Sequence, residues 1–336
     1  MIVANNNFTP LGNTGPQHVS KIGLGAMGMS GMYGSSDDAQ SIATIHAALD
    51  NGINLIDTGD FYGMGHNELL IGRALKGRRD QALLSVKFGA MRDPASGWGG
   101  FDGRPAAVKN FLAYSLQRLG VEHIDIYRMA RLDPNVPIED SIGAISDMVK
   151  AGYVRHIGLS EVRVETIRRA HAAHPICDLQ IEYSLVSRKP EEAIFPVLAA
   201  LGIGVTAYGV LSRGLLSGSK PIGPKDMRSH LPRFNGENAV KNEHLVGVLH
   251  QLAAEMNASA SQVAIAWVLA RGQKLGIDMV ALVGSRTTKQ LVEAVGAQAL
   301  TMSAADLQRI ETAIPASAIA GDRYAPHQMA LLDSEK

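Results

Sequence analysis

Three residues early in the chain have side chains that could pass a proton between them: Asp57, Tyr62 and Lys87. A tyrosine phenol ordinarily titrates at about pH 10, so it needs a neighbouring cation to transfer protons near neutrality. A lysine ammonium is such a cation, and a carboxylate would hold that lysine in place and keep it charged. Each residue alone has an ordinary structural explanation, because lysines snorkel and loop tyrosines pack. Together they predict acid–base chemistry, provided that the fold brings them together.

Repeated short apolar strands, each followed by an amphipathic helix, give these residues their positions. Strands that are apolar on both faces are typical of a parallel sheet covered by helices. Asp57 ends the second expected strand and Lys87 ends the third, so neighbouring strands would bring them to one edge. We expect strands at 21–25, 53–57, 82–87, 124–129, 154–159, 179–182, 205–208 and 279–283.

Helices are expected between these strands. The clearest covers 106–119, where apolar residues recur at the three-and-four spacing of one buried face. Ser259 with Gln262 forms a capping-box pattern that opens a helix through 271, and Ser303 with Asp306 opens a last one. The others are expected at 38–50, 68–75, 138–150, 164–172, 190–201, 245–256 and 288–296. Repeats of this kind predict an α/β fold, a (β/α)8 TIM barrel, as a single domain over 1–336.

Two further features accompany the expected barrel. Segments 8–11 and 18–20 flank Gly12-Asn13-Thr14-Gly15, a hairpin signal, and this hairpin could plug the N-terminal end of the barrel. The loops at 89–104 and from 212 to about 239 are long. Long loops at the C-terminal face of a barrel are where binding usually occurs.

Composition narrows the function classes. The chain has 336 residues, 32 basic and 32 acidic, so its formal net charge is zero, which argues against a nucleic acid or an anionic membrane as the main partner. Cys177 is the single cysteine and cannot form an internal disulfide, as in a reducing compartment. The N-terminus lacks signal-peptide features, and the most apolar stretch is interrupted by Pro196 and several glycines. We therefore expect a cytoplasmic protein that does not span a membrane.

Motifs for other chemistries occur in the wrong context. Residues 23–28 read G-x-G-x-x-G after a strand, as in dinucleotide-binding Rossmann folds, but the next helix should begin only near Asp37. A glycine-rich turn at the barrel mouth explains the motif better. His171 and His174 have no acidic or cysteine partner nearby, so no metal site is predicted.

With these motifs in place, the chain resembles the aldo-keto reductase family. Residues 57–63, Asp-Thr-Gly-Asp-Phe-Tyr-Gly, are similar to the family's D-T-A-x-x-Y-G, and 85–89 are similar to its lysine strand. Further ordered matches lie at 22–30, 124–127, 157–161, 179–184 and 321–324. The resemblance implies NADPH-dependent reduction of aldehydes or ketones, or the reverse oxidation of an alcohol, without metal. Tyr62 would give the proton. Lys87 and Asp57 match the residues that lower the pKa of this phenol and orient it.

The resemblance also implies a set of NADPH or NADP+ contacts. Ser160 and Gln180 match the side chains that hold the carboxamide, and Tyr208 matches the aromatic that stacks on the nicotinamide. Arg286 is the candidate for the 2′-phosphate, because a guanidinium fits phosphate oxygens bidentately. The remaining positions are Ala26, Met27, Asp57, Arg228, Gly284, Gln290, Glu293 and the pyrophosphate loop Gly209, Val210, Leu211, Arg213 and Gly214. Gly209 and Val210 replace the usual Ser-Pro.

One departure from the family pattern affects catalysis directly. The family has a histidine after the fourth strand, which donates a hydrogen bond to the substrate carbonyl, and here Ala130 stands in that place. Arg128 lies on the same strand face and could supply the missing positive field; alternatively, it is an interior arginine paired with a structural carboxylate. Three explanations remain open: an active reductase with another donor, a deliberate His-to-Ala change, or a cofactor-binding sensor or regulatory subunit. The potassium-channel β subunits, which resemble this family, also lack the histidine.

The substrate is expected to be a small carbonyl compound or alcohol. Loop position suggests a largely apolar pocket, which suits aromatic or aliphatic compounds. Whether the protein is a monomer or a homo-oligomer is left open by the sequence. The residues expected to line the substrate pocket are Met29, Tyr33, Met91, Trp98, Arg128 and Phe234.

Overall fold

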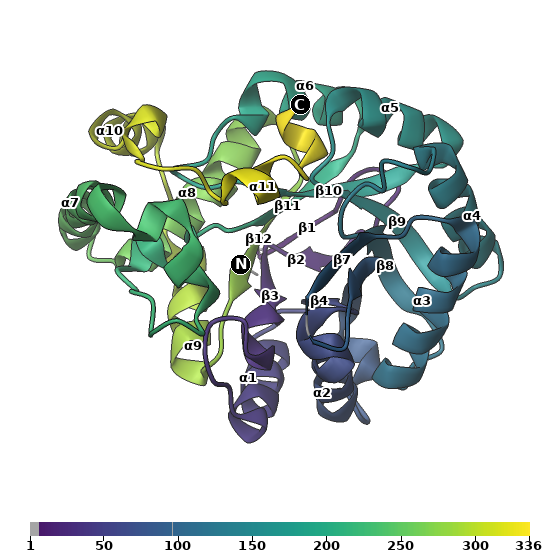
Figure 1. The fold of residues 1–336 in the computed structure, drawn as a ribbon. Helices are drawn as coiled ribbons and strands as arrows, with labels where there is room; N and C mark the ends of the chain where they lie inside the picture. Colours follow the sequence, from purple (N-terminus) through teal and green to yellow (C-terminus); the bar gives the residue numbers. More distant parts are fainter. Residues whose placement is uncertain (1–6, 96) are drawn as a thin grey trace, which may run out of the picture.

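A closed barrel of parallel strands forms the centre of the computed structural model, which describes residues 7–95 and 97–336 (Figure 1). Consecutive barrel strands pair in chain order, and the last closes on the first. The strands are β3 (Ile22–Gly25), β4 (Leu55–Gly59), β5 (Leu83–Phe88), β8 (Ile124–Met129), β9 (Val154–Ser160), β10 (Ile176–Glu182), β11 (Gly204–Tyr208) and β12 (Met279–Gly284). The predicted (β/α)8 barrel is confirmed.

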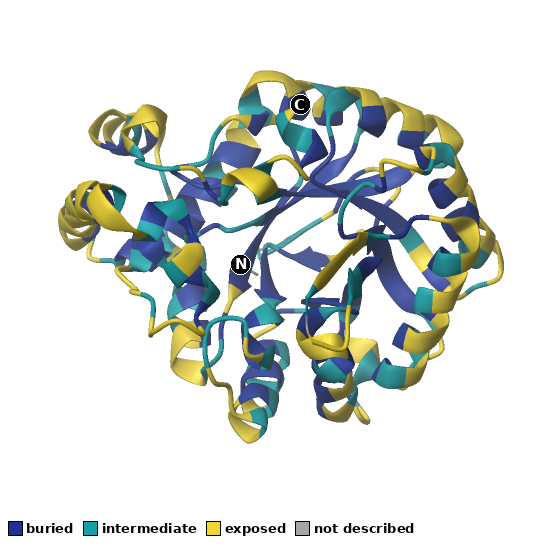
Figure 2. Ribbon diagram, in the orientation of Figure 1, coloured by how far each residue is buried: buried dark blue, intermediate teal, exposed yellow. Residues whose placement is uncertain are grey.

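Helices surround the barrel with their apolar faces inward. Figure 2 shows the barrel strands almost entirely buried and the outer faces of the helices exposed. The barrel helices are α1 (Asp38–Asp50), α2 (His66–Ala74), α3 (Pro105–Leu119), α4 (Ile138–Lys150), α5 (Val164–Ala173), α6 (Pro190–Leu201), α8 (Ala260–Leu275) and α9 (Thr288–Gly296). Additional helices are α7 (Gly236–Glu255), α10 (Ala304–Ala313) and α11 (Pro326–Met329). Both capping boxes form as predicted, at Ser259 and Ser303.

Two elements begin three or more residues earlier than the sequence indicated. β10 starts at Ile176 because buried Asp178 belongs to the strand, although a charged residue interrupts its apolar pattern. α7 starts at Gly236 because polar contacts hold its first turns. The sequence prediction relied on the spacing of apolar residues and therefore missed these turns. The buried Asn242 amide donates to the carbonyls of Arg233 and Ala320, both at 2.9 Å. None of the described helices is long and apolar enough to cross a membrane.

A short hairpin covers the N-terminal end of the barrel, as predicted. β1 (Phe8–Thr9) and β2 (Val19–Ser20) pair antiparallel. The amide of Asn13 in the connecting turn donates to the carbonyl of Gly202, just before β11, at 2.8 Å. Leu11 and Val19 are fully buried and pack with Leu55, Ile126, Cys177 and Val280 from the barrel bottom. The hairpin therefore completes the core at this end.

Gly12 should be the residue of this hairpin least tolerant of substitution. Its φ is +73°, and an added Cβ would lie 2.2 Å from the Cys177 carbonyl oxygen. Gly120 is the matched control, with φ +65° and no atom within 4 Å. Gly120→Ala should lose about 1–2 kcal/mol from backbone strain alone, and Gly12→Ala a further 1–3 kcal/mol, roughly, from overpacking. Urea unfolding midpoints measure both, and equal losses would contradict the packing argument.

Candidate active site

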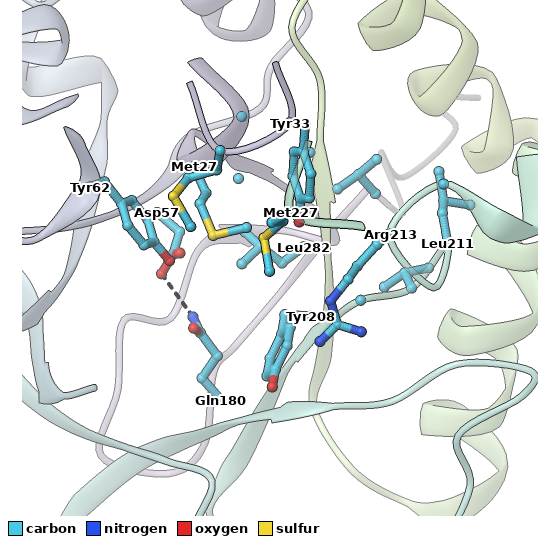
Figure 3. Close-up of a pocket in the computed structure, with 18 of the residues that line it drawn as sticks. Met27, Tyr33, Asp57, Tyr62, Gln180, Tyr208, Leu211, Arg213, Met227 and Leu282 are labelled. Carbon is cyan, nitrogen blue, oxygen red and sulfur yellow. Dashed lines mark hydrogen bonds between the residues drawn. The ribbon is translucent and has the colours of Figure 1, made fainter. Parts of the chain in front are cut away.

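A cavity of about 760 Å³ opens at the C-terminal ends of the barrel strands (Figure 3). This volume is within the range of small-molecule and cofactor sites. All three predicted catalytic residues line this cavity: Asp57 from β4, Lys87 from β5 and Tyr62 from the turn after β4. The predicted grouping therefore exists in the folded chain.

Asp57 and Lys87 form a buried ion pair on neighbouring strands. The other carboxylate oxygen, Asp57 Oδ2, accepts hydrogen bonds from Ser85 Oγ and Gln180 Nε2, both at 2.8 Å. Figure 3 shows the Gln180 amide directed at Asp57 with Tyr62 beside them. A buried charge needs such compensation, because desolvating it without partners costs several kcal/mol. The contacts fix the Lys87 ammonium at the base of the cavity.

Tyr62 lies above this pair. It opens a 3-10 turn (Tyr62–Gly65) and is 6% exposed, and the Lys87 ammonium nitrogen is 5.2 Å from its ring centroid. Burial, together with the Asp57 charge, raises the pKa of Tyr62 above its usual value. Burial also lowers the pKa of Lys87, although Asp57 opposes that effect. The phenol therefore keeps its proton at neutral pH, which is the state that a proton donor requires.

Most of the predicted cofactor positions lie on the cavity wall. Ala26 does not: it is fully buried beneath the wall, and its amide donates to the Asp57 carbonyl at 2.9 Å. That prediction was wrong because the chain turns inward between Gly25 and Met27, which both reach the cavity. The positions on the wall are Met27, Asp57, Ser160, Gln180, Tyr208, Gly209, Val210, Leu211, Arg213, Gly214, Arg228, Gly284, Arg286, Gln290 and Glu293.

Two serines on this wall have unused hydroxyls. In the described part of the chain, Ser160 Oγ and Ser285 Oγ are buried and have no hydrogen-bond partner. Leaving such a group unpaired is costly, so each is a candidate to bond a ligand. An added Cβ at Gly284 would meet only one atom, 3.9 Å away, so the backbone there is open to close approach. This wall fits a polar, elongated cofactor.

The cavity arginines differ in how far they are already engaged. Arg228 pairs with Asp226 at 2.7 Å and also donates to Ser219 and the Lys220 carbonyl. Arg213 pairs with Glu182 at 2.9 Å. Arg286 makes no ion pair within the described residues, and its Nη1 donates to the Tyr33 carbonyl at 3.0 Å. Arg286 is thus the more available cation on this side.

The C-terminal segment forms a wall that sequence reasoning missed. Arg323 donates to both oxygens of Glu161, each at 2.8 Å, and the Tyr208 hydroxyl donates to Glu161 Oε1 at 2.7 Å. These bonds hold the segment across the barrel mouth. The available signal was the 321–324 match, which includes Arg323 and Tyr324. The segment contributes Tyr324, His327, Gln328, Leu331 and Leu332 to the cavity.

Four of the six predicted substrate residues do not line the cavity, whereas Tyr33 and Trp98 do. Met29 is fully buried and packs into the core, since it lies on the inward side of a 3-10 turn (Met27–Ser30). Met91 packs beside Gly99 on the hairpin formed by β6 (Ala90–Arg92) and β7 (Trp98–Phe101). Phe234 is half-buried outside the cavity lining, and its ring centroid lies 5.9 Å from the guanidinium carbon of Arg228. Loop position alone does not say which side chains turn inward.

Arg128 is the fourth incorrect residue. It is fully buried inside the barrel and bonds Asp178 Oδ1 at 3.0 Å. Strand alternation gave its face correctly but not its depth, and Arg128 lies one layer below the cavity. The alternative of an interior arginine paired with a structural carboxylate is the correct one. Ala130 and Arg131, by contrast, both line the cavity, and Arg131 was not anticipated.

The fold and site define a (β/α)8 barrel with an acid–base group at the C-terminal ends of its strands, and comparison with known proteins is consistent with that class. The sequence profile of the aldo/keto reductase family matches residues 21–315. Glycine max probable aldo-keto reductase 1 is 40% identical over 313 residues, 91% of this chain and 88% of that protein. The chain belongs to the aldo/keto reductase family, a family of oxidoreductases.

Solved structures agree. The glycerol dehydrogenase of Gluconobacter oxydans is 28% identical, with a TM-score of 0.83 over 92% of this chain and 95% of that one. An aldo-keto reductase of Bacillus halodurans, in its holo form, is also 28% identical, with a TM-score of 0.77 over 92% and 97%. An aldo/keto reductase of Klebsiella pneumoniae in complex with NADP and acetate is 21% identical and shares the fold, with a TM-score of 0.73 over 95% and 99%.

Asp60, just before Phe61 and Tyr62, provides a test of electrostatics near the site. It is buried, its Oδ1 has no partner within the described residues, and Oδ2 accepts from the Gly89 amide at 3.3 Å. Burial, reinforced by Glu68, raises the pKa of Asp60 to about 7. An aspartate of the unfolded chain titrates at about 3.9. The folded state therefore binds the extra proton, and stability falls as pH rises from about 4 to 7.

Asp60→Asn should remove this loss. The variant should gain stability relative to the parent as pH rises from 5 to 8, by roughly 1–3 kcal/mol. Urea midpoints at both pH values measure the difference. Asp80→Asn, at an exposed position, is the control and should show no such trend. A difference between Asp60→Asn and the parent that does not change with pH would contradict the argument.

Proposed function

We propose that the protein is an NADP(H)-dependent oxidoreductase that interconverts aldehydes or ketones and alcohols, with Tyr62 as general acid and base. The observation that carries this proposal is the protonated, buried Tyr62 phenol above the Asp57–Lys87 pair. It lies in one cavity with two serine hydroxyls that have no protein partner. The family membership and the similarity to a glycerol dehydrogenase support the same reaction class.

The residues present fit NADPH or NADP+. When bound, the reduced cofactor supplies a hydride to the carbonyl carbon. Ser160 would donate to the carboxamide oxygen, and Gln180 would accept from the carboxamide nitrogen through its amide oxygen, since its nitrogen is bonded to Asp57. The Tyr208 ring lines the cavity at the place where a flat ring would stack. Arg286 would hold the 2′-phosphate.

The proton then comes from the chain itself. Tyr62 donates its phenolic proton to the carbonyl oxygen during reduction and takes it back during oxidation. Lys87 holds a positive charge 5.2 Å from the centroid of the phenol ring, which favours the phenolate whenever it forms. Asp57 keeps this lysine charged and oriented, and Ser85 and Gln180 fix Asp57.

The substrate end of the cavity is largely aromatic. Phe61, Tyr33, Trp98, Phe101 and Tyr324 contribute to its wall. Aromatic side chains bury flat apolar groups well. An aromatic or aliphatic carbonyl compound, or the corresponding alcohol, is the proposed substrate class.

A second candidate is an NADP(H)-binding sensor or regulatory subunit with little turnover. The observation that favours it is Ala130, which lines the cavity but whose methyl group can donate no hydrogen bond to a carbonyl. Turnover separates the two candidates, because a sensor would bind NADPH tightly yet reduce no carbonyl at a useful rate.

Tyr62→Phe tests the proposed chemistry. Loss of the proton donor should lower kcat by about 10²–10⁴-fold on a panel of aldehydes and ketones, followed by NADPH absorbance. The NADPH dissociation constant, measured by fluorescence, should stay near that of the parent. Tyr114→Phe, at an exposed position, is the control and should keep parental activity. Turnover of Tyr62→Phe at the parental rate would exclude Tyr62 as the general acid.

Arg286→Met tests the cofactor assignment. A hydrogen bond to a charged group contributes about 1.5–3 kcal/mol, so preference for NADPH over NADH should fall about 10–100-fold. The ratio of the two dissociation constants measures this change. Lys289→Met is the control for loss of a positive charge, because Lys289 is exposed in the first turn of α9. If Arg286→Met discriminates between the cofactors as the parent does, another residue reads the phosphate.

A further inference from the structure

We propose that Arg131 is the hydrogen-bond donor and fixed positive charge for the carbonyl oxygen of the substrate, acting beside the Ala130 methyl. This inference rests on the proposed function and assigns the catalytic group that the site otherwise lacks. Arg131 is a different residue from Arg128, which is fully buried below the cavity and whose Nη2 bonds Asp178.

The position of Arg131 follows from the end of β8. The Ala130 amide donates to the Phe88 carbonyl at 2.8 Å, which fixes residue 130 at the rim of the barrel. Arg131 Nη1 donates to the Ala130 carbonyl at 2.6 Å, so the guanidinium folds back over the peptide of residue 130. Both residues line the cavity together with Tyr62. The guanidinium thus lies on the side of the cavity where residue 130 offers only a methyl group.

The guanidinium is also available. Within the described part of the chain, the bond to Ala130 is its only hydrogen bond, and no carboxylate pairs with it. A guanidinium has five N–H donors, so most remain for a ligand. Arg213 and Arg228, on the same cavity, are each held by a carboxylate. Glu161, the acidic residue whose charge reaches Arg131, is itself bonded through both oxygens to Arg323.

Its charge acts on the reacting groups. Burial and Asp57 raise the pKa of Tyr62, and the positive charge of Arg131 opposes this increase. During reduction the carbonyl carbon would accept the hydride that a bound nicotinamide cofactor supplies, the C=O π pair would move to oxygen, and that oxygen would take the Tyr62 proton. Arg131 neither gains nor loses a proton; it donates a hydrogen bond to that oxygen while negative charge develops. A fixed donor of this kind contributes about 10²–10³-fold to kcat.

Arg131→Met should lower kcat by about 10²–10³-fold, with little change in the NADPH dissociation constant. Added guanidinium ion should restore part of the rate, and Arg131→Lys should keep more activity than Arg131→Met. Ala130→His supplies a donor at the neighbouring position, so the Arg131→Met loss should shrink in that background. Arg309→Met, on the exposed surface of α10, controls for loss of an arginine and should behave as the parent. A rescue by guanidinium is not expected of a merely structural residue.

A binding readout separates failure of this inference from failure of the proposed function. Benzoate, whose carboxylate stands in for the developing negative oxygen, should bind at least tenfold more weakly to Arg131→Met than to the parent, by calorimetry with saturating NADP+. If the parent turns over carbonyls but Arg131→Met is equally active, the inference is wrong. If the parent turns over nothing, the proposed function has failed, and the benzoate affinities decide alone: equal affinities would overturn the role of Arg131. If Arg131→Met does not fold, Arg131→Gln, which also lacks the positive charge, gives the same comparison.

Discussion

The buried ion pair between Asp57 and Lys87 is the interaction on which the rest of the site depends. Taking two charges out of water costs several kcal/mol each, and attraction between them repays this only when the remaining lone pairs are also bonded. The barrel meets that condition because β4 and β5 are adjacent and because β10, on another side of the bore, supplies the Gln180 amide. An open sheet would not bring β10 to the same carboxylate. The hydrogen bonds that complete the Asp57–Lys87 pair therefore depend on closure of the barrel.

A second polar layer lies beneath this pair and explains why the barrel interior tolerates so many charges. Arg128 bonds Asp178, which also accepts from Thr206 Oγ1 at 2.5 Å. Gly158 has no side chain here because a Cβ would lie 2.5 Å from the Asp178 carboxylate. Arg128 on β8 lies opposite Lys87 in the register of the neighbouring strand β5. Its positive charge lowers the pKa of that lysine. The lower layer is structural, yet it contributes to the electrostatic field that the upper layer uses.

The sequence predicts the order of strands and helices, because the periodicity of apolar residues is a local property. It also predicts that Asp57, Tyr62 and Lys87 lie together, because the ends of the strands can be located locally. The failures occurred where three-dimensional detail decides. Alternation predicted the face of Arg128 but not its depth, and loop position did not predict that Met29 turns inward while Met27 reaches the cavity. The C-terminal wall was missed because its contacts, Arg323 with Glu161, join residues 162 positions apart. No local sequence pattern predicts a contact between residues so far apart in the chain.

Neutral composition conceals how the positive charges are distributed. Of the cavity arginines, Arg213 and Arg228 are held by carboxylates and brace the loop after β11, whereas Arg286 and Arg131 have no such partner in the described chain. Arg286 follows β12 and Arg131 follows β8, and these strands are four places apart in a closed ring of eight. The two available cations therefore lie on opposite sides of the barrel mouth. Under the proposed function, the bound cofactor and substrate would together span the mouth, with the cofactor phosphate near β12 and the substrate carbonyl oxygen near β8. Tyr62, after β4, lies between those two sides in the strand order, where its proton would reach the carbonyl oxygen of the proposed substrate.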